Sequence, residues 1–94
     1  MQIVKIGQDM DAATMATMKS EFETLAVSAD SVRLDLEGVE FIDSSGIGGI
    51  VFLFKRLRER SLKLSLVNVD GQPLRLMQEL HLGFLIENPT TLAA

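Results

Sequence analysis

The hydrophobic pattern changes its period along the chain, from the two-residue alternation of a strand to helical spacing and back, and this change limits the possible folds most strongly. Four strands are predicted, at Gln2–Ile6, Val32–Glu37 with an extended continuation Val39–Ile42, Ser61–Val67 and Phe84–Ile86. Three helices are predicted between them, at Asp11–Ala26, from the Asp43–Gly46 turn to about Arg60, and from Gln72-Pro73 onward. Because the connections are short, this order predicts an α/β domain with a mixed, mainly parallel sheet of about four strands flanked by helices.

The ends and faces of these elements carry further signals. Asp11 is a plausible N-cap for the first helix, and Gly83 is a candidate cap at the end of the third. Pro89 then limits the last residues of the chain to a turn or a frayed tail. The strict alternation of Val32–Glu37 predicts that one sheet face is wet or only partly covered. The core face of the first helix is predicted to comprise Met15, Met18, Phe22 and Leu25, and that of the third Leu76, Met77 and Leu80.

The composition restricts the chemistry. A length of 94 residues fits a single domain, 1–94. The chain has no cysteine and one histidine, which excludes disulfides, thiolate metal sites and paired-histidine sites. A Ser-His-Asp triad would have to use His81, which lies in a leucine-rich segment and is more often structural there. We therefore expect a protein that is not an enzyme and has no metal or cofactor.

The charge is acidic and unevenly distributed. The formal net charge of -4 divides into -6 for residues 1–47 and +2 for residues 48–94. The acidic balance argues against nucleic-acid binding, and the acidic half either is an ordinary solvated surface or faces a basic partner. The longest uncharged run, Ser44–Phe54, has 11 residues, too few to cross a membrane. The start of the chain lacks signal-peptide features, so we expect a cytoplasmic protein without direct membrane insertion.

The segment Asp43-Ser44-Ser45-Gly46-Ile47-Gly48-Gly49-Ile50 is the least ordinary stretch of the chain. A glycine inside a helix costs about 0.8–1 kcal/mol relative to alanine, so the adjacent pair at positions 48 and 49 requires a reason. Either a neighbouring element or a partner approaches closely there. The basic residues at the helix end complement its dipole and need no nucleic-acid explanation. The candidate partner-binding surface comprises Ser45, Gly46, Ile47, Gly48, Gly49 and Phe52.

The serines of this turn admit three interpretations. The structural one is that Ser44 or Ser45 caps the helix or is its first residue. A nucleophile is disfavoured, because the Gly-x-Ser-x-Gly elbow is missing. The third is a phosphoacceptor at Ser44, with Ser45 as the rival position. A phosphate there would add about -1.5 to -2 charges beside Asp43, and Asp43 and Asp11 would set the local acidity and hold the turn.

The residues Leu34 through Gly48, with Asp11-Ala12-Ala13-Thr14 and Arg75 through Leu82, resemble the STAS domain family, specifically the bacterial anti-sigma factor antagonists. The resemblance covers nearly the whole chain and implies a switch. It implies that Ser44 is phosphorylated by an ATP-dependent anti-sigma kinase and dephosphorylated by a PP2C-type phosphatase. The unphosphorylated form would bind the anti-sigma factor kinase and release a sigma factor.

The family also offers an alternative interpretation. Some STAS domains are constitutive subunits of bacterial ABC-type lipid transport systems, in which Ser44 would only cap a helix and contact a partner. Nucleotide or small-ligand binding at the same turn has weak support, since no phosphate loop is visible. The chain departs from the family pattern in the spacing of Gly7 and Asp11, which have Asp9 between them. The family usually has two N-terminal strands, and this chain begins near the second. We expect a monomer when the protein is free.

Overall fold

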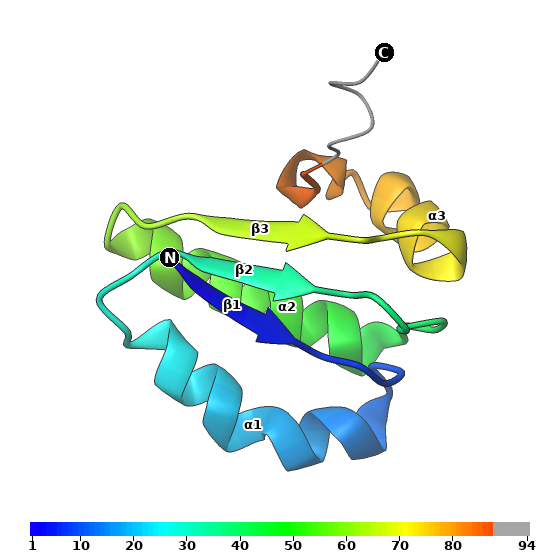
Figure 1. Ribbon diagram of the computed structural model, residues 1–94, viewed down its shortest axis with the longest axis horizontal. Helices are drawn as coiled ribbons and strands as arrows, with labels where there is room; N and C mark the ends of the chain where they lie inside the picture. Colours follow the sequence, from blue (N-terminus) through cyan, green and yellow to red (C-terminus); the bar gives the residue numbers. More distant parts are fainter. Residues whose placement is uncertain (88–94) are drawn as a thin grey trace.

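The computed structural model describes residues 1–87, in which three parallel strands form one sheet in the order β1-β2-β3 (Figure 1). The chain alternates strands and helices, as the changing period predicts, and the parallel strands are joined by crossovers that contain the helices. The elements are β1 (Gln2–Lys5), α1 (Ala12–Ala26), β2 (Val32–Asp35), α2 (Ser44–Glu59), β3 (Leu64–Val67), α3 (Gly71–Glu79) and a 3₁₀ turn, η1 (Gly83–Leu85).

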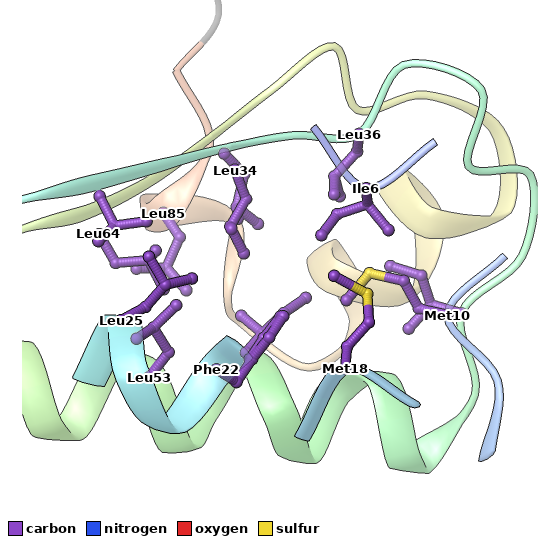
Figure 2. Close-up of a cluster of buried hydrophobic side chains, with 14 of the residues drawn as sticks. Ile6, Met10, Met18, Phe22, Leu25, Leu34, Leu36, Leu53, Leu64 and Leu85 are labelled. Atoms are coloured by element: carbon purple, nitrogen blue, oxygen red, sulfur yellow. The ribbon is translucent and has the colours of Figure 1, made fainter. Parts of the chain in front are cut away.

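The core lies between one face of the sheet and the helix pair α1 and α2. In register, Val4, Leu34 and Leu66 lie side by side across the three strands, and Leu34 and Leu66 are completely buried. Phe22 from α1 and Leu53 from α2 project toward this face, as Figure 2 shows. Because alternate strand residues point to opposite faces, every second position of β2 and β3 enters the core.

The other sheet face is only partly covered, which confirms the prediction from the alternation of Val32–Glu37. Arg33 and Ser65 are neighbours on this face, and both are half-buried. Arg33 forms an ion pair with Glu87, at 2.8 Å between Nη2 and Oε2. The C-terminal end of the described chain thus lies along the outer edge of β3, where the Glu87 amide donates to the Leu66 carbonyl, and the Glu87 side chain reaches Arg33 on the open face.

The sheet has three strands within residues 1–87, and the predicted fourth strand at Phe84–Ile86 is wrong. The segment curls into η1, because the Leu85 and Ile86 amides donate locally to the carbonyls of Leu82 and Gly83. Ile86 then makes a single parallel bridge to Leu66. An apolar run of three residues is consistent with a strand, but here it forms a short turn in which Leu85 is buried and Phe84 is exposed. Pro89 lies outside the described residues.

The C-terminal ends of α2 and α3 use left-handed residues other than glycine. Ser61 follows α2 with φ 59°, and His81 follows α3 with φ 60°. The next amides fold back, from Leu62 to the Leu57 carbonyl and from Leu82 to the Met77 carbonyl. The expectation that Gly83 ends the third helix is therefore wrong, because His81 takes the left-handed position two residues earlier.

Replacing Ser61 by glycine is expected to stabilise the domain by about 1 kcal/mol, since glycine adopts the left-handed conformation without a Cβ clash. Thermal unfolding should show a midpoint raised by roughly 4–8 °C for a domain of this size. The matched control is Ser20→Gly in the middle of α1, which should lower the midpoint. An equal effect of both substitutions would contradict the argument.

Candidate functional site

The two polar turns that follow β1 and β2 meet at the carboxyl edge of the sheet. Met10 pairs with Ile42 in a parallel bridge. Its amide donates to the Phe41 carbonyl at 2.9 Å, and its carbonyl accepts from the Asp43 amide at 3.2 Å. Each strand is thereby extended by one rung beyond its regular end, and the start of α2 is placed directly beside the start of α1.

Asp43 connects the first turns of both helices through its carboxylate. Oδ1 accepts hydrogen bonds from the amides of Ser45 at 2.8 Å and Gly46 at 3.1 Å, which caps α2. Oδ2 accepts from the amide of Ala12, the first residue of α1, at 3.1 Å. One carboxylate therefore satisfies three of the amides that helix starts leave without a partner.

Of the two expected places for a serine at the start of α2, the structure has the first helical residue and not the cap. The N-cap is Asp43, and Ser44 is the first helical residue. Both Ser44 and Ser45 are exposed, and within residues 1–87 neither hydroxyl makes a hydrogen bond. No hydrogen bond joins His81 to either serine in this part of the chain. The two hydroxyls are thus exposed at the surface and make no hydrogen bond within the described residues.

Asp11 caps α1 in the expected way. Its Oδ1 accepts from the Thr14 amide at 2.9 Å, and hydrogen bonds from Thr14 to the charged carboxylate lower the pKa of Asp11. Asp11 and Asp43 are both half-buried and lie at the starts of adjacent helices. The two carboxylates named from the sequence are therefore brought together at one site.

Two further residues hold this site and were missed in the sequence. Asp9 Oδ1 accepts from the Glu40 amide at 3.0 Å and ties the two turns together. The Gln72 side chain, at the start of α3, accepts from the Ile42 amide and donates to the Ile42 carbonyl, both at 2.9 Å. Asp9 was noted only as a departure from the family spacing. Nothing in the sequence distinguishes Gln72 from other polar residues at a helix start.

The three glycines of α2 have different environments. A Cβ added to Gly46 would lie 2.5 Å from the Met10 carbonyl oxygen and 2.7 Å from Ile42 Cγ2, so the close approach of the first turn requires glycine. A Cβ on Gly49 would lie 2.4 Å from Met15 Cε, on α1. Packing against backbone therefore explains Gly46, whereas at Gly49 the nearest atom is the flexible end of the Met15 side chain, which can move aside. Gly48 is exposed, and an added Cβ would meet no atom of residues 1–87 within 4 Å.

Two grooves flank the helix start. The α1–α2 groove, of about 220 Å³, has Ser45, Gly49 and Phe52 on its α2 side and Met15 and Phe22 on its α1 side. The α2–α3 groove, of about 470 Å³, is lined by Phe41, Ser44, Ile47, Gln72 and Leu76, among others. Phe52 is 36% exposed and Phe41 45%. Of the candidate contact residues of the sequence analysis, Ser45, Gly48 and Phe52 are exposed, Ile47 and Gly49 are half-buried, and Gly46 is buried.

These features define a small α/β protein with a parallel sheet, a helix pair on one sheet face and an exposed serine at a tightly capped helix start. The sequence profile of the STAS domain matches residues 1–93. The chain belongs to the STAS domain family. Within residues 1–87, no helix is long and apolar enough to span a membrane.

Relatives from Listeria and Bacillus with similar sequences are named anti-sigma-B factor antagonists. The chain is 34% identical over 83 residues to the anti-sigma-B factor antagonist of Listeria monocytogenes, covering 87% of this chain and 73% of that protein. It is 27% identical over 73 residues to the anti-sigma-B factor antagonist of Bacillus subtilis, covering 78% and 67%.

Solved structures share the fold at lower identity. The Bacillus cell fate determinant SpoIIAA in its phosphorylated form superimposes with a TM-score of 0.74 at 17% identity, covering 90% of this chain and 78% of that one. A Thermotoga maritima structure described as a candidate anti-sigma factor antagonist gives a TM-score of 0.78 at 18% identity, with coverage of 93% and 79%. The α/β fold predicted from the sequence is therefore confirmed.

Replacing Asp43 by alanine is expected to destabilise the domain by about 2 kcal/mol, because three backbone amides lose their acceptor. Asp43→Asn should cost about half as much, since one amide oxygen can still cap α2. Urea unfolding followed by circular dichroism measures both. The matched control is Asp70→Ala, because Asp70 precedes α3 but makes no side-chain cap hydrogen bond. A loss as large for Asp70→Ala as for Asp43→Ala would contradict the assigned role.

The lowered pKa of Asp11 makes stability depend on pH. A carboxyl whose pKa is lower in the folded than in the unfolded chain stabilises the fold above its unfolded pKa, and this contribution disappears as the pH falls through the folded pKa. Asp11→Asn keeps a capping oxygen but cannot titrate. Thermal unfolding between about pH 5 and pH 2 should therefore show a smaller acid loss in Asp11→Asn than in the wild type. Equal acid losses would refute the assignment.

Proposed function

We propose that this protein is a phosphorylation-regulated anti-sigma factor antagonist. In its unmodified form it binds an anti-sigma factor that is also a serine kinase, and this binding releases the kinase's target. Phosphorylation of Ser44 abolishes the binding, and a PP2C-type phosphatase reverses it. The chain acts in the cytoplasm as a binding module, and the partner supplies the catalytic chemistry. The names of the relatives from Listeria and Bacillus support the class of partner.

One observation carries the proposal: Ser44 presents a free hydroxyl at the surface while Asp43 performs the structural work of the cap. Ser44 is exposed and is the first residue of α2, and both Asp43 carboxylate oxygens are already engaged. The serine is therefore not needed to satisfy the helix. Its hydroxyl is accessible to a kinase, and its modification leaves the cap hydrogen bonds in place.

The occupied cap also explains why a phosphate would act as a negative signal. The amides of Ser45 and Gly46 donate to Asp43 and are not available to a phosphate. A phosphate on Ser44 would therefore add about -1.5 to -2 charges beside an existing carboxylate. At about 5 Å and an effective dielectric near 20, each unit pair repels by roughly 3 kcal/mol before screening. A partner surface that fits a neutral serine and the adjoining carboxylate would be opposed by this charge.

Gly48 supports the same face as the docking surface. Glycine at this position weakens the helix by up to about 1 kcal/mol, and no neighbour within residues 1–87 requires it. It lies one turn after Ser44, between the half-buried Ile47 and Val51 and near the exposed ring of Phe52. A missing side chain at this point lets a partner approach the backbone of α2 directly beside the phosphoacceptor.

Ser44→Asp should weaken binding to the anti-sigma kinase of the same organism by on the order of 100-fold, measured by calorimetry. Ser44→Ala should bind like the unmodified wild type and should not be phosphorylated by the kinase and ATP. Equal affinities of Ser44→Asp and wild type would overturn the proposal. So would a phosphate that persists in Ser44→Ala, which would assign the acceptor to Ser45.

Gly48→Ala is the matched test of the surface. Alanine should raise the free energy of unfolding by up to about 1 kcal/mol while it weakens kinase binding about tenfold, because the added methyl group separates the two surfaces. If the variant is more stable and binds the kinase with normal affinity, Gly48 does not lie in the interface. Recovery of an ABC-type ATPase instead of a kinase, with Ser44 unmodified in the native cell, would favour a constitutive transport subunit.

A further inference from the structure

Opposite charges occupy the two ends of α2. At its start, the linked turns hold four carboxylates, those of Asp9, Asp11, Glu40 and Asp43, and the backbone and side-chain hydrogen bonds described above fix these turns together. At its end, Lys55, Arg56 and Arg58 are exposed. The helix has 16 residues, so these charges are separated by up to about 24 Å along its axis.

Two of the bases at the end of α2 lie over aromatic rings, and one of these two also forms an exposed ion pair. Arg58 lies over the ring of Phe54 at 5.9 Å, and Arg56 lies over the ring of Phe52 at 5.6 Å. Arg56 also forms an exposed pair with Glu59 at 3.5 Å, which contributes little in water. Within residues 1–87, neither Lys55 nor Arg58 forms an ion pair. Stacking on aromatic rings leaves the guanidinium edges free to donate hydrogen bonds.

The exposed ridge of α2 connects the two ends. At 100° per residue, one stripe of the helix carries Ser44, Gly48, Val51, Lys55 and Arg58. Val51 is half-buried and Gly48 offers no side chain. The ridge therefore carries no large side chain between Ser44 and Val51, although the exposed ring of Phe52 flanks it. It begins beside the carboxylate of Asp43 and ends at the bases Lys55 and Arg58, so a second ridge laid against it in the antiparallel direction presents opposite charges.

We propose that the occupant of this ridge in the phosphorylated state is a second copy of the same chain, with the two α2 helices antiparallel about a two-fold axis at Val51. This inference rests on the proposed phosphorylation of Ser44. Ser44 and Arg58 each lie seven positions from Val51, about 10 Å along the helix, so the symmetry sets Ser44 of one copy opposite Arg58 of the other. The antiparallel arrangement also places each helix start beside the opposite dipole end of its mate.

The phosphate determines whether the pair forms. A contact made by one helix per copy is small compared with the interface of a stable dimer, so the unmodified chain remains largely monomeric. A phosphoserine at position 44 is repelled by Asp43 of its own chain and meets Arg58 and Lys55 of the second copy, where charge-assisted hydrogen bonds are strong. Each copy completes the phosphate site of the other. The ridge that the unmodified protein offers to the kinase is then covered.

The test uses the full chain with phosphoserine incorporated at position 44 during translation, so that it does not depend on the native kinase. Sedimentation equilibrium at about 50 mM salt should give a dimer dissociation constant at least tenfold lower than that of the unmodified chain. Arg58→Glu should cancel this gain, whereas Lys63→Glu, an equal charge change on an exposed residue outside α2, should leave it intact.

A crosslink tests the geometry independently. The chain has no cysteine, so the disulfide formed by a Val51→Cys variant must join two copies at the proposed axis. Oxidation should crosslink phosphorylated Val51→Cys much faster than unmodified Val51→Cys, and Lys63→Cys should show no such difference. Equal dimerisation with and without the phosphate, or equal losses from Arg58→Glu and Lys63→Glu, would overturn the inference. If the kinase does not phosphorylate Ser44, the proposed function is refuted, but the sedimentation and crosslinking results remain valid because they use incorporated phosphoserine.

Discussion

The carboxylate of Asp43 is the interaction on which the arrangement of this domain depends. It accepts two amides of α2 and one amide of α1, so it fixes the starts of the two helices that cover the sheet. The adjacent bridge between Met10 and Ile42 fixes the strands from which these helices emerge. Because helix starts hold amides without partners, a single charged acceptor shared between them sets both the position of the helices and the electrostatics of the turn.

This arrangement separates the residue that caps α2 from the proposed phosphoacceptor at the next position. Asp43 is engaged and half-buried, whereas Ser44 is exposed with a free hydroxyl. If the serine itself capped the helix, its modification would remove a hydrogen bond and disturb the fold. With the cap on the preceding residue, the surface charge can change while the helix start stays intact. The proposed switch therefore alters what the domain presents to a partner and leaves its own structure unchanged.

The sequence predicts the architecture well because period and connection length are local properties. The order of the elements and the N-cap at Asp11 follow from single segments. The number of strands cannot be predicted in this way, because the apolar segment Phe84–Ile86 fits a strand and a turn equally well. Which of the two forms depends on the local hydrogen bonds to the carbonyls of Leu82 and Gly83. The sequence leaves open whether a serine caps α2 or is its first residue, because Asp43 can equally be assigned to the end of the preceding strand. The reason for Gly46 requires the position of Met10, which is distant in sequence.

The side chain of Gln72 occupies the position that a third strand would take beside Ile42, beyond the end of β3. Ile42 faces Met10 on one side, and on the other its amide and carbonyl are both bonded to the Gln72 side chain, where the next strand would otherwise lie. A carboxamide has the same donor and acceptor as a peptide group, so it completes the rung without any backbone. The segment leading to Ser44 therefore exposes no unpaired backbone group at Ile42 to which a foreign strand could add, because one side chain of α3 occupies that position.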